Sequence, residues 1–290
     1  MDNTCPVCGS QKINYYLEKN SFKYNKCDDC NLVFLEKIPE DLEKYYSEGY
    51  FTGDLELDGY VDYESEKELT RVSFEKYLDF IENHIKEKNR LLEVGCATGY
   101  FLDLAKKRGW NTKGVDISKY AVEEALKKGH DVICSKIEDL HDDDNLSSHD
   151  VVVMLDALEH LTSPKQDLKK MSNFLKPDGL FVFSTPDSSS LWSKVWGRKW
   201  HAFVPPQHIH VFSSENVRFL LEDVGLEVKF VGHYGKNFSL PYIFRLLNTW
   251  TKMKIWFLLA KFTSKHGFLK KITIPINLGD TMFVIAQKVK

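Results

Sequence analysis

The fold is decided by one stretch of the sequence, Leu91-Leu-Glu-Val-Gly-Cys-Ala-Thr-Gly-Tyr-Phe-Leu102. The stretch begins with a short apolar run that is typical of a buried strand, and it ends with residues that suit the start of a helix. Between the two lies a turn containing Gly95 and Gly99, and glycine lets a backbone come close to a ligand. The stretch therefore predicts a strand, a ligand-binding turn and a helix.

Two common nucleotide-binding motifs do not fit this turn. A dinucleotide fingerprint needs Gly-x-Gly-x-x-Gly, but alanine and tyrosine stand at the second and third glycine positions. No Gly-Lys-Ser/Thr follows, which excludes a P-loop. The pattern that remains is Glu93-x-Gly95-x-Ala97-x-Gly99, followed by Asp116 at the end of the next predicted strand. A carboxylate at that place can accept hydrogen bonds from both hydroxyls of a ribose.

Outward from this unit, predicted strands and helices alternate along the chain. The predicted strands are 90–95, 112–116, 131–134, 150–155, 180–185, 227–232 and 281–287. The predicted helices are 99–108, 119–128, 164–175 and 214–224. Such alternation is typical of the α/β class, so we expect a doubly wound, Rossmann-like, seven-stranded sheet.

In order and spacing, these residues resemble the motifs of class I S-adenosylmethionine-dependent methyltransferases, from about residue 90 to 232 and again from 280. The resemblance implies S-adenosylmethionine as the cofactor, with the turn beneath its methionine part and an acidic residue on its ribose. The implied cofactor-binding residues are Glu93, Gly95, Ala97, Gly99, Asp116, Ile117, Ile137, Glu138, Asp156 and His160. Taken singly, Gly99 also suits a helix start, Asp116 a helix cap and Glu138 a solvated charge.

Four cysteines near the N-terminus form two pairs, each with a two-residue gap: Cys5, Cys8, Cys27 and Cys30. This spacing is typical of zinc ligands, since two such pairs complete a tetrahedron of thiolates. Four thiolates leave no open position for substrate, so the sequence predicts a structural Zn²⁺ in a zinc ribbon over residues 1–38. Disulfides are the alternative, which a reducing cytosol disfavours.

The general base is sought among histidines, because a base works best with a pKa near 7. Three of the ten histidines fall in Trp200-His-Ala-Phe-Val-Pro-Pro-Gln-His-Ile-His210. Extended spacing predicts that His208 and His210 share one face, and His208 is the first choice. The segment resembles the acceptor-side loop of zinc-ribbon methyltransferases in glycan and natural-product pathways. This resemblance implies a lid of Tyr50, Tyr60 and Tyr63, with a packing role for these tyrosines as the alternative. The alternative is that His208 only bonds backbone or cofactor.

Positive charge is concentrated late in the chain, although the net charge is -3. Residues 228–279 hold nine Lys or Arg and no Asp or Glu. Within them Ile243, Leu246, Leu247, Trp250, Met253, Phe257 and Ala260 recur at helical spacing, which predicts a basic amphipathic helix. Such a helix can dock on the core, rest through 241–271 on an anionic membrane, or cover a phosphate-bearing acceptor.

Together these observations predict three parts: the ribbon, a linker and helical cap over 39–89, and a methyltransferase domain over 90–290 with an insertion at 235–279. The predicted reaction is O-methylation of a small-molecule, sugar-linked or lipid-linked hydroxyl. RNA methylation and a non-catalytic binding module are the rivals, but nucleic acid is disfavoured because Asp28 and Asp29 lie inside the second cysteine pair. The first residues lack the pattern of a signal peptide, which favours the cytoplasm, with the inner membrane face as the peripheral alternative.

Overall fold

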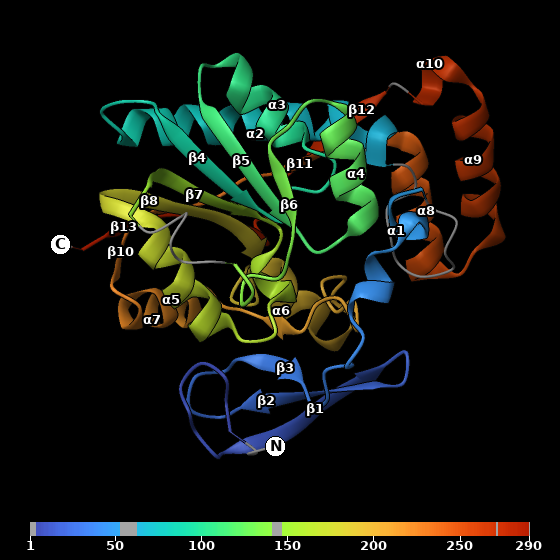
Figure 1. Ribbon diagram of the computed structural model, residues 1–290. Helices are drawn as coiled ribbons and strands as arrows, with labels where there is room; N and C mark the ends of the chain where they lie inside the picture. Colours follow the sequence, from blue (N-terminus) through green and yellow to red (C-terminus); the bar gives the residue numbers. More distant parts are fainter. Residues whose placement is uncertain (1–3, 53–62, 141–146, 271, 290) are drawn as a thin grey trace.

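The computed structural model describes residues 4–52, 63–140, 147–270 and 272–289, and its centre is a seven-stranded sheet (Figure 1). The strand order is β10-β13-β8-β7-β4-β5-β6. Strands β4 to β8 pair in parallel, whereas β13 is antiparallel to both of its neighbours. The bounds are Arg90–Val94 (β4), Asn111–Asp116 (β5), Val132–Cys134 (β6), His149–Leu155 (β7), Leu175–Pro186 (β8), Leu226–His233 (β10) and Thr281–Lys288 (β13). The predicted doubly wound sheet is confirmed.

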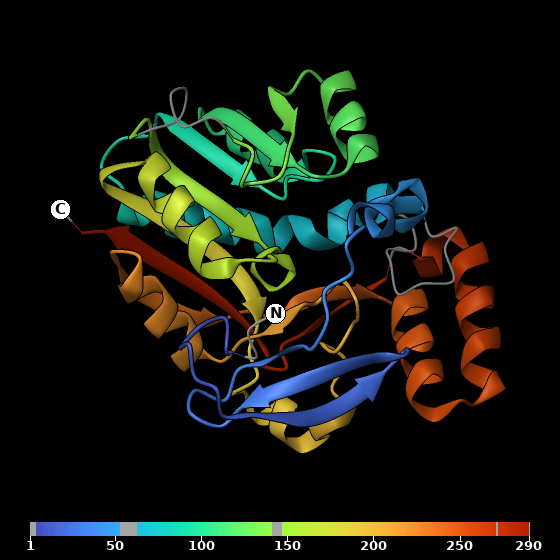
Figure 2. The ribbon, with the colours of Figure 1, turned by 60° about the horizontal axis from the view of Figure 1, so that its bottom comes forward.

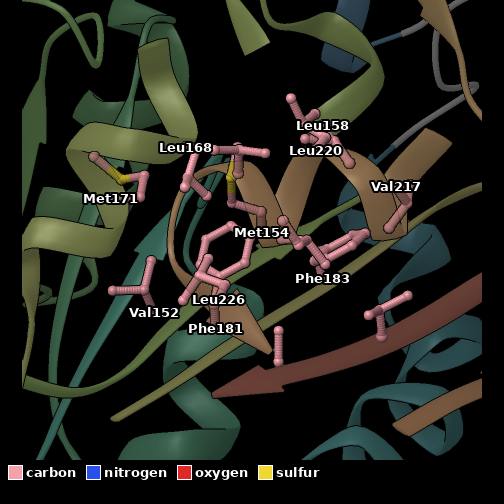
Figure 3. Close-up of a cluster of buried hydrophobic side chains, with 14 of the residues drawn as sticks. Val152, Met154, Leu158, Leu168, Met171, Phe181, Phe183, Val217, Leu220 and Leu226 are labelled. Carbon is pink, nitrogen blue, oxygen red and sulfur yellow. The ribbon is translucent and has the colours of Figure 1, made fainter. Parts of the chain in front are cut away.

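The strands bury both of their faces because apolar residues occupy odd and even positions alike. Val152 and Met154 of β7 belong to one core cluster, while Val151 and Val153 belong to another. Figure 3 shows part of the first cluster, in which Leu168 lies beside Met154. Sheets of this kind are stable only when helices cover both faces.

Helices cover the two faces in two sets. The first core cluster includes residues of α5 (Pro164–Phe174) and α7 (Ser214–Asp223). The second includes residues of α2 (Tyr63–His84), α3 (Tyr100–Lys107) and α4 (Lys119–Lys127). The long α2 falls within the segment predicted as linker and cap, and it packs on the sheet through Tyr77, whose ring stacks on Phe283 at 4.3 Å.

The cysteine-bearing segment forms β1 (Ile13–Lys19), β2 (Phe22–Cys27) and β3 (Val33–Leu35). A fourth strand, β9 (His210–Val211), joins this small sheet from far along the chain and pairs antiparallel with β3. A shared apolar cluster ties the two segments together, since Leu17, Tyr24 and Leu35 pack with Trp200, Phe203 and Ile209. The ribbon therefore holds the histidine-rich segment directly. In Figure 1 the ribbon strands, in blue, lie below the main sheet, on the side of α5 and α7.

The basic insertion is a helical hairpin carried on a two-stranded ladder of β11 (Lys236–Ser239) and β12 (Thr273–Ile276). It contains α8 (Leu240–Thr251), α9 (Lys254–Lys265) and α10 (Gly267–Lys270). The predicted single helix is wrong, because the chain turns at Lys252, which has a left-handed backbone conformation with φ +56°. The turn breaks the predicted stripe: Phe257 is exposed, whereas Ala260 is buried. Over the described residues, none of the helices combines the length and apolar character needed to cross a membrane.

Three shorter elements also belong to the fold. A 3₁₀ turn at Glu43–Tyr46 and α1 (Glu48–Thr52) precede α2, and α6 (Leu191–Trp196) follows β8. The strand β8 begins at Leu175, so residues 176–179, between the predicted helix 164–175 and the predicted strand 180–185, lie inside the strand, where its pairing with β7 shifts register. These differences concern element ends and leave the layered architecture unchanged.

Candidate active site

A cavity of about 1110 Å³ opens at the carboxyl ends of the parallel strands. Gly95 and Ala97 line it after β4, Asp116 at the end of β5, and Asp156 after β7. Ligands of open α/β sheets bind at this edge because the loops that leave the strands converge there. The volume is enough for a nucleoside cofactor together with a second small molecule.

The glycine turn has the backbone geometry that its sequence predicts. Gly95, Ala97 and Gly99 all have positive φ, at 76°, 47° and 82°. A side chain on Gly95 would meet Ala157 at 3.0 Å, so glycine keeps this approach open. Ala97 holds a conformation that costs an L-residue energy, and it is held there by a hydrogen bond from its N–H to Asp116 Oδ2 at 2.8 Å.

Asp116 is an acidic residue of the cavity, and the turn holds its carboxylate through the Ala97 N–H. Its Oδ1 accepts a second hydrogen bond, from the N–H of Ser118 at 2.8 Å. Burial raises the pKa of Asp116, while the backbone N–H groups of Ser118 and Ala97 oppose that shift. Each oxygen keeps a further lone pair, so the carboxylate can still accept bonds from ligand hydroxyls.

Three more predicted cofactor residues line the cavity beside Asp116, and one does not. Ile117, Ile137 and Glu138 are among the lining residues, and Glu138 is exposed. Gly99 is not among them, because it caps α3 and lies against the ring of His130, which a Cβ would meet at 2.6 Å. Gly99 thus supports the turn from behind.

Glu93 is a buried carboxyl that lines the cavity. Its Oε2 has no hydrogen bond among the described residues. Burial, and then the nearby Asp116, raise the pKa of Glu93 well above its usual range. An orphaned buried oxygen is costly unless a ligand satisfies it, so Glu93 fits a bound polar group such as the ammonium of a methionine moiety.

On the other side of the cavity, the exit of β7 carries Asp156 and His160. Asp156 Oδ1 accepts a hydrogen bond from Ser184 Oγ at 3.0 Å. His160 Nδ1 lies 2.7 Å from the carbonyl oxygen of Gln207 and 3.0 Å from the hydroxyl of Tyr46. Burial lowers the pKa of His160, although hydrogen bonds to the carbonyls of Gln207 and Asp156 act in the opposite direction. His160 therefore fastens the β7 exit to the 200–208 loop.

His208 lines the cavity next to His160, with the ring centroids 4.9 Å apart. Its Nδ1 lies 2.7 Å from the carbonyl oxygen of Ala202. A carbonyl oxygen only accepts, so Nδ1 of the neutral ring carries the proton and Nε2 keeps its lone pair. The arrangement leaves His208 able to take up a proton at Nε2.

His210 does not share this position, so the predicted common face is wrong. The chain turns at His208, whose N–H bonds to the carbonyl of Val204, and extended pairing begins only at His210. His210 is buried in the β3–β9 ladder and is absent from the cavity lining. Its pKa is lowered to about 4 by burial. Sequence alternation failed here because it assumed an extended strand through residue 208.

The cavity also has tyrosine residues, of which the sequence identified one. Tyr46 and Tyr50 line it, and burial raises the pKa of both, so their hydroxyls stay protonated. Tyr46 was missed because its region has no clear periodicity. Tyr60 lies outside the described residues, and the side chain of Tyr63 is not described either.

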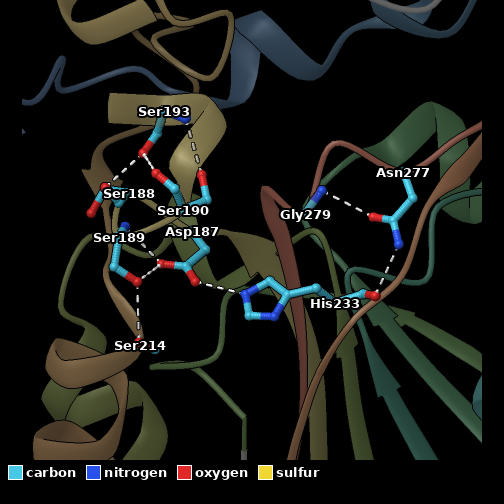
Figure 4. A network of polar contacts seen from close by, with 9 residues as sticks. All are labelled: Asp187, Ser188, Ser189, Ser190, Ser193, Ser214, His233, Asn277 and Gly279. Carbon is cyan, nitrogen blue, oxygen red and sulfur yellow. Dashed lines mark hydrogen bonds and ion pairs between the residues drawn. The ribbon is translucent and has the colours of Figure 1, made fainter. Parts of the chain in front are cut away.

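The loop that carries His208 is closed at its base by a polar network (Figure 4). Asp187 is buried, and its Oδ2 lies 2.8 Å from His233 Nε2. Its Oδ1 accepts hydrogen bonds from the N–H and hydroxyl of Ser189. The N–H of Ser188 bonds to the carbonyl of Phe212 at 2.8 Å, which ties the two ends of the loop together.

The four N-terminal cysteines converge on one point. Their sulfur atoms lie within 4.8 Å of one another, with Cys5 to Cys30 at 3.5 Å and Cys8 to Cys27 at 3.6 Å. A disulfide would need about 2.05 Å, whereas thiolates on one tetrahedral zinc lie roughly 3.8 Å apart. The arrangement therefore fits a Zn²⁺ ion with four sulfur ligands.

Comparison with known proteins agrees with this geometry. A family model described as "Methyltransferase domain" matches residues 64–229. The ubiquinone biosynthesis O-methyltransferase of Idiomarina loihiensis is 37% identical over 116 residues, which cover 37% of this chain and 47% of that protein. The chain thus matches about half the length of its curated relatives.

Solved structures share the fold. An S-adenosylmethionine-dependent methyltransferase from Archaeoglobus fulgidus superposes with a TM-score of 0.54 at 23% identity, covering 82% of this chain and 99% of that one. The plantazolicin methyltransferase BpumL, solved in complex with SAH, has a TM-score of 0.52 at 15% identity, covering 78% and 88%.

Proposed function

Because the chain belongs to the methyltransferase domain family, we propose that it transfers a methyl group from S-adenosylmethionine to a hydroxyl oxygen. The resemblance to S-adenosylmethionine-dependent methyltransferases noted in the sequence is confirmed by the family match. The acceptor is a small-molecule, sugar-linked or lipid-linked hydroxyl. The curated relatives are named as O-methyltransferases of ubiquinone biosynthesis, which supports oxygen as the attacked atom.

The observation that carries this proposal is the 2.7 Å contact between His208 Nδ1 and the carbonyl oxygen of Ala202. The Nδ1 proton of His208 is held by the carbonyl of Ala202, so Nε2 is the ring atom that accepts a proton from the acceptor hydroxyl. The bound donor would supply the methyl group, whose bond to sulfur would break as the hydroxyl oxygen attacks the carbon, while His208 would take the hydroxyl proton at Nε2. His208 gives the proton to solvent after the methylated product is released.

The remaining residues bind and align the reactants. In this proposal Asp116 holds the ribose hydroxyls, Glu138 contacts the adenine and Glu93 binds the methionine end; all three residues line the cavity. The donor supplies an electrophilic methyl group when bound. Alignment of two reactants in one cavity can lower the barrier by several kcal/mol. Zn²⁺ on the four cysteines has a structural role, because its coordination is complete without substrate.

The test is the variant His208→Ala, with the exposed His84→Ala of α2 as the matched control. Turnover is followed as S-adenosylhomocysteine released with a panel of hydroxylated acceptors, and cofactor binding by calorimetry. We expect turnover to fall roughly 10²–10⁴-fold in His208→Ala while cofactor affinity stays unchanged. The pH profile of wild-type turnover should fall on its acidic side, where the base becomes protonated. This acidic limb should be absent from the pH profile of His208→Ala.

Two results would contradict the proposal. Full turnover in His208→Ala would show that His208 is not the general base. Methylation confined to nitrogen or carbon acceptors would show that oxygen is not the attacked atom. A chain that binds no S-adenosylmethionine would contradict the cofactor itself.

A further inference from the structure

The hairpin of α8, α9 and α10 is the feature that the proposed chemistry leaves unexplained. Figures 1 and 2 both show α9 as the outermost element, with α8 between it and the rest of the molecule. The hairpin packs largely on itself, for example through Phe244 and Trp256, whose rings stack at 5.9 Å. On α9, the buried residues Ala260 and Thr263 lie on one side of the helix.

The rest of the α9 surface is exposed and carries large apolar side chains. Its large side chains, with those of the neighbouring turn and α10, are between 48% and 79% exposed: Met253, Ile255, Phe257, Leu258, Phe262 and Phe268. Single exposed apolar side chains are ordinary, but a dense group on a few turns of helix marks an interaction surface. We call these six residues, together with the lysines described next, the hairpin face.

Lysines are interleaved with this apolar group. Lys254, Lys261 and Lys265 are exposed and lie at helical spacing on the same side of α9 as Leu258. Residues 228 to 279 hold nine Lys and Arg and no acidic residue. The rest of the chain carries a net charge of -12. The hairpin face is therefore strongly cationic as well as apolar.

The combination of apolar and cationic side chains indicates what kind of partner binds the hairpin face. The core of a protein interface is depleted in lysine, because buried ammonium groups lose their hydration. A second copy of the chain would set lysines against lysines. An anionic bilayer accepts both components, since apolar side chains enter the acyl boundary while ammonium groups reach up to the phosphates. We infer that the hairpin face docks on the surface of an anionic lipid membrane.

Docking there would also place the cavity at the membrane. Phe238, Tyr242, Arg245 and Lys252, all from the hairpin or its ladder, line the same cavity as Asp116. An acceptor anchored by a lipid tail could then enter without leaving the bilayer. This second step rests on the proposed methyl transfer, whereas membrane docking itself does not.

The test is sedimentation of the full chain with vesicles of phosphatidylglycerol and phosphatidylcholine, compared with phosphatidylcholine alone. We expect pelleting only with the anionic vesicles, weakened roughly tenfold between low and high salt as surface charges are screened. The variants Phe257→Gln/Leu258→Gln and Lys254→Gln/Lys261→Gln should each reduce pelleting at least roughly tenfold. The matched controls are Leu126→Gln, which alters an apolar side chain of α4 that is 52% exposed, and Lys106→Gln/Lys107→Gln on α3.

The outcomes separate the inference from the proposed function. Turnover with a water-soluble acceptor should be unchanged in all these variants, because none of the substituted residues lines the cavity. Wild-type protein that stays in the supernatant with anionic vesicles, or hairpin variants that pellet like the controls, would overturn docking even if methyl transfer is intact. A dimer that dissociates in Phe257→Gln/Leu258→Gln would assign the face to a second copy instead.

Discussion

The hydroxyl of Tyr24 tests whether the zinc ribbon positions the catalytic loop. Tyr24 lies in β2, its side chain is fully buried, and its hydroxyl donates to the carbonyl oxygen of His208 at 2.7 Å. Burial raises the pKa of Tyr24, so the hydroxyl keeps the proton that it donates. The substitution Tyr24→Phe removes this donor and leaves the ring, which packs edge-on against Phe203 at 5.4 Å.

The size of the expected fall in kcat follows from the His208 carbonyl, which loses its hydrogen-bond donor in Tyr24→Phe. A buried acceptor that loses its donor costs about 1–3 kcal/mol, and the least costly relief is for the loop to move so that water reaches the carbonyl. Because His208 provides that carbonyl, the movement displaces the proposed base. A cost of this size predicts a fall in kcat of roughly 5- to 150-fold.

The assay separates positioning from folding. We expect kcat to fall in Tyr24→Phe while the affinity for S-adenosylmethionine stays unchanged, because the residues assigned to the cofactor lie on other elements. The control is Tyr15→Phe in β1, where the side chain is 59% exposed. A kcat and a pH profile equal to those of the wild type would refute the positioning role, whatever happens to the melting temperature.

Three further predictions concern other parts of the chain. Asp116→Asn should weaken S-adenosylmethionine binding roughly 10- to 100-fold in calorimetry, since hydrogen bonds to a charged group contribute about 1.5–3 kcal/mol; an unchanged affinity would refute its role. Cys27→Ser should abolish zinc binding in metal analysis and lower the melting temperature, whereas Cys134→Ser, at an exposed cysteine, should do neither. His210 has a pKa of about 4 in the folded chain against 6.5 in the unfolded chain, so between these pH values the unfolded chain takes up a proton there more readily. The free energy of unfolding should therefore fall by up to about 3 kcal/mol as the pH is lowered from 6.5 to 4. Urea unfolding should therefore show a smaller loss over that range in His210→Leu, and equal slopes would contradict this.

The cofactor half of the site could be predicted from the sequence because it is local. Gly95 and Ala97 follow one strand directly, and Asp116 ends the next strand, so adjacent parallel strands bring them together without further information. The cysteine pairs are local in the same sense. Spacing along the chain therefore translates into spacing in the fold.

The acceptor half could not be predicted in this way. The β3–β9 ladder joins Val33 to Val211 and includes only two residue pairs, which is too short for any alternation to show. Tyr46 and Gln207 reach His160 through tertiary packing alone. The turn at Lys252 escaped prediction because lysine gives no signal for a left-handed conformation, in contrast to glycine or asparagine.

The distribution of these contacts has a consequence for the ribbon. It lies far from the residues assigned to the cofactor in sequence, yet three of its groups hold the 200–212 segment: Tyr24 through the His208 carbonyl, Lys19 through the Phe203 carbonyl at 2.7 Å, and Leu35 through the Ile209 carbonyl at 2.9 Å. A metal that stabilises β1 to β3 would then stabilise the acceptor side of the cavity while leaving the glycine turn untouched. Chelation of the purified protein should accordingly depress kcat before it weakens cofactor binding, and simultaneous loss of both would show that the ribbon supports the whole domain instead.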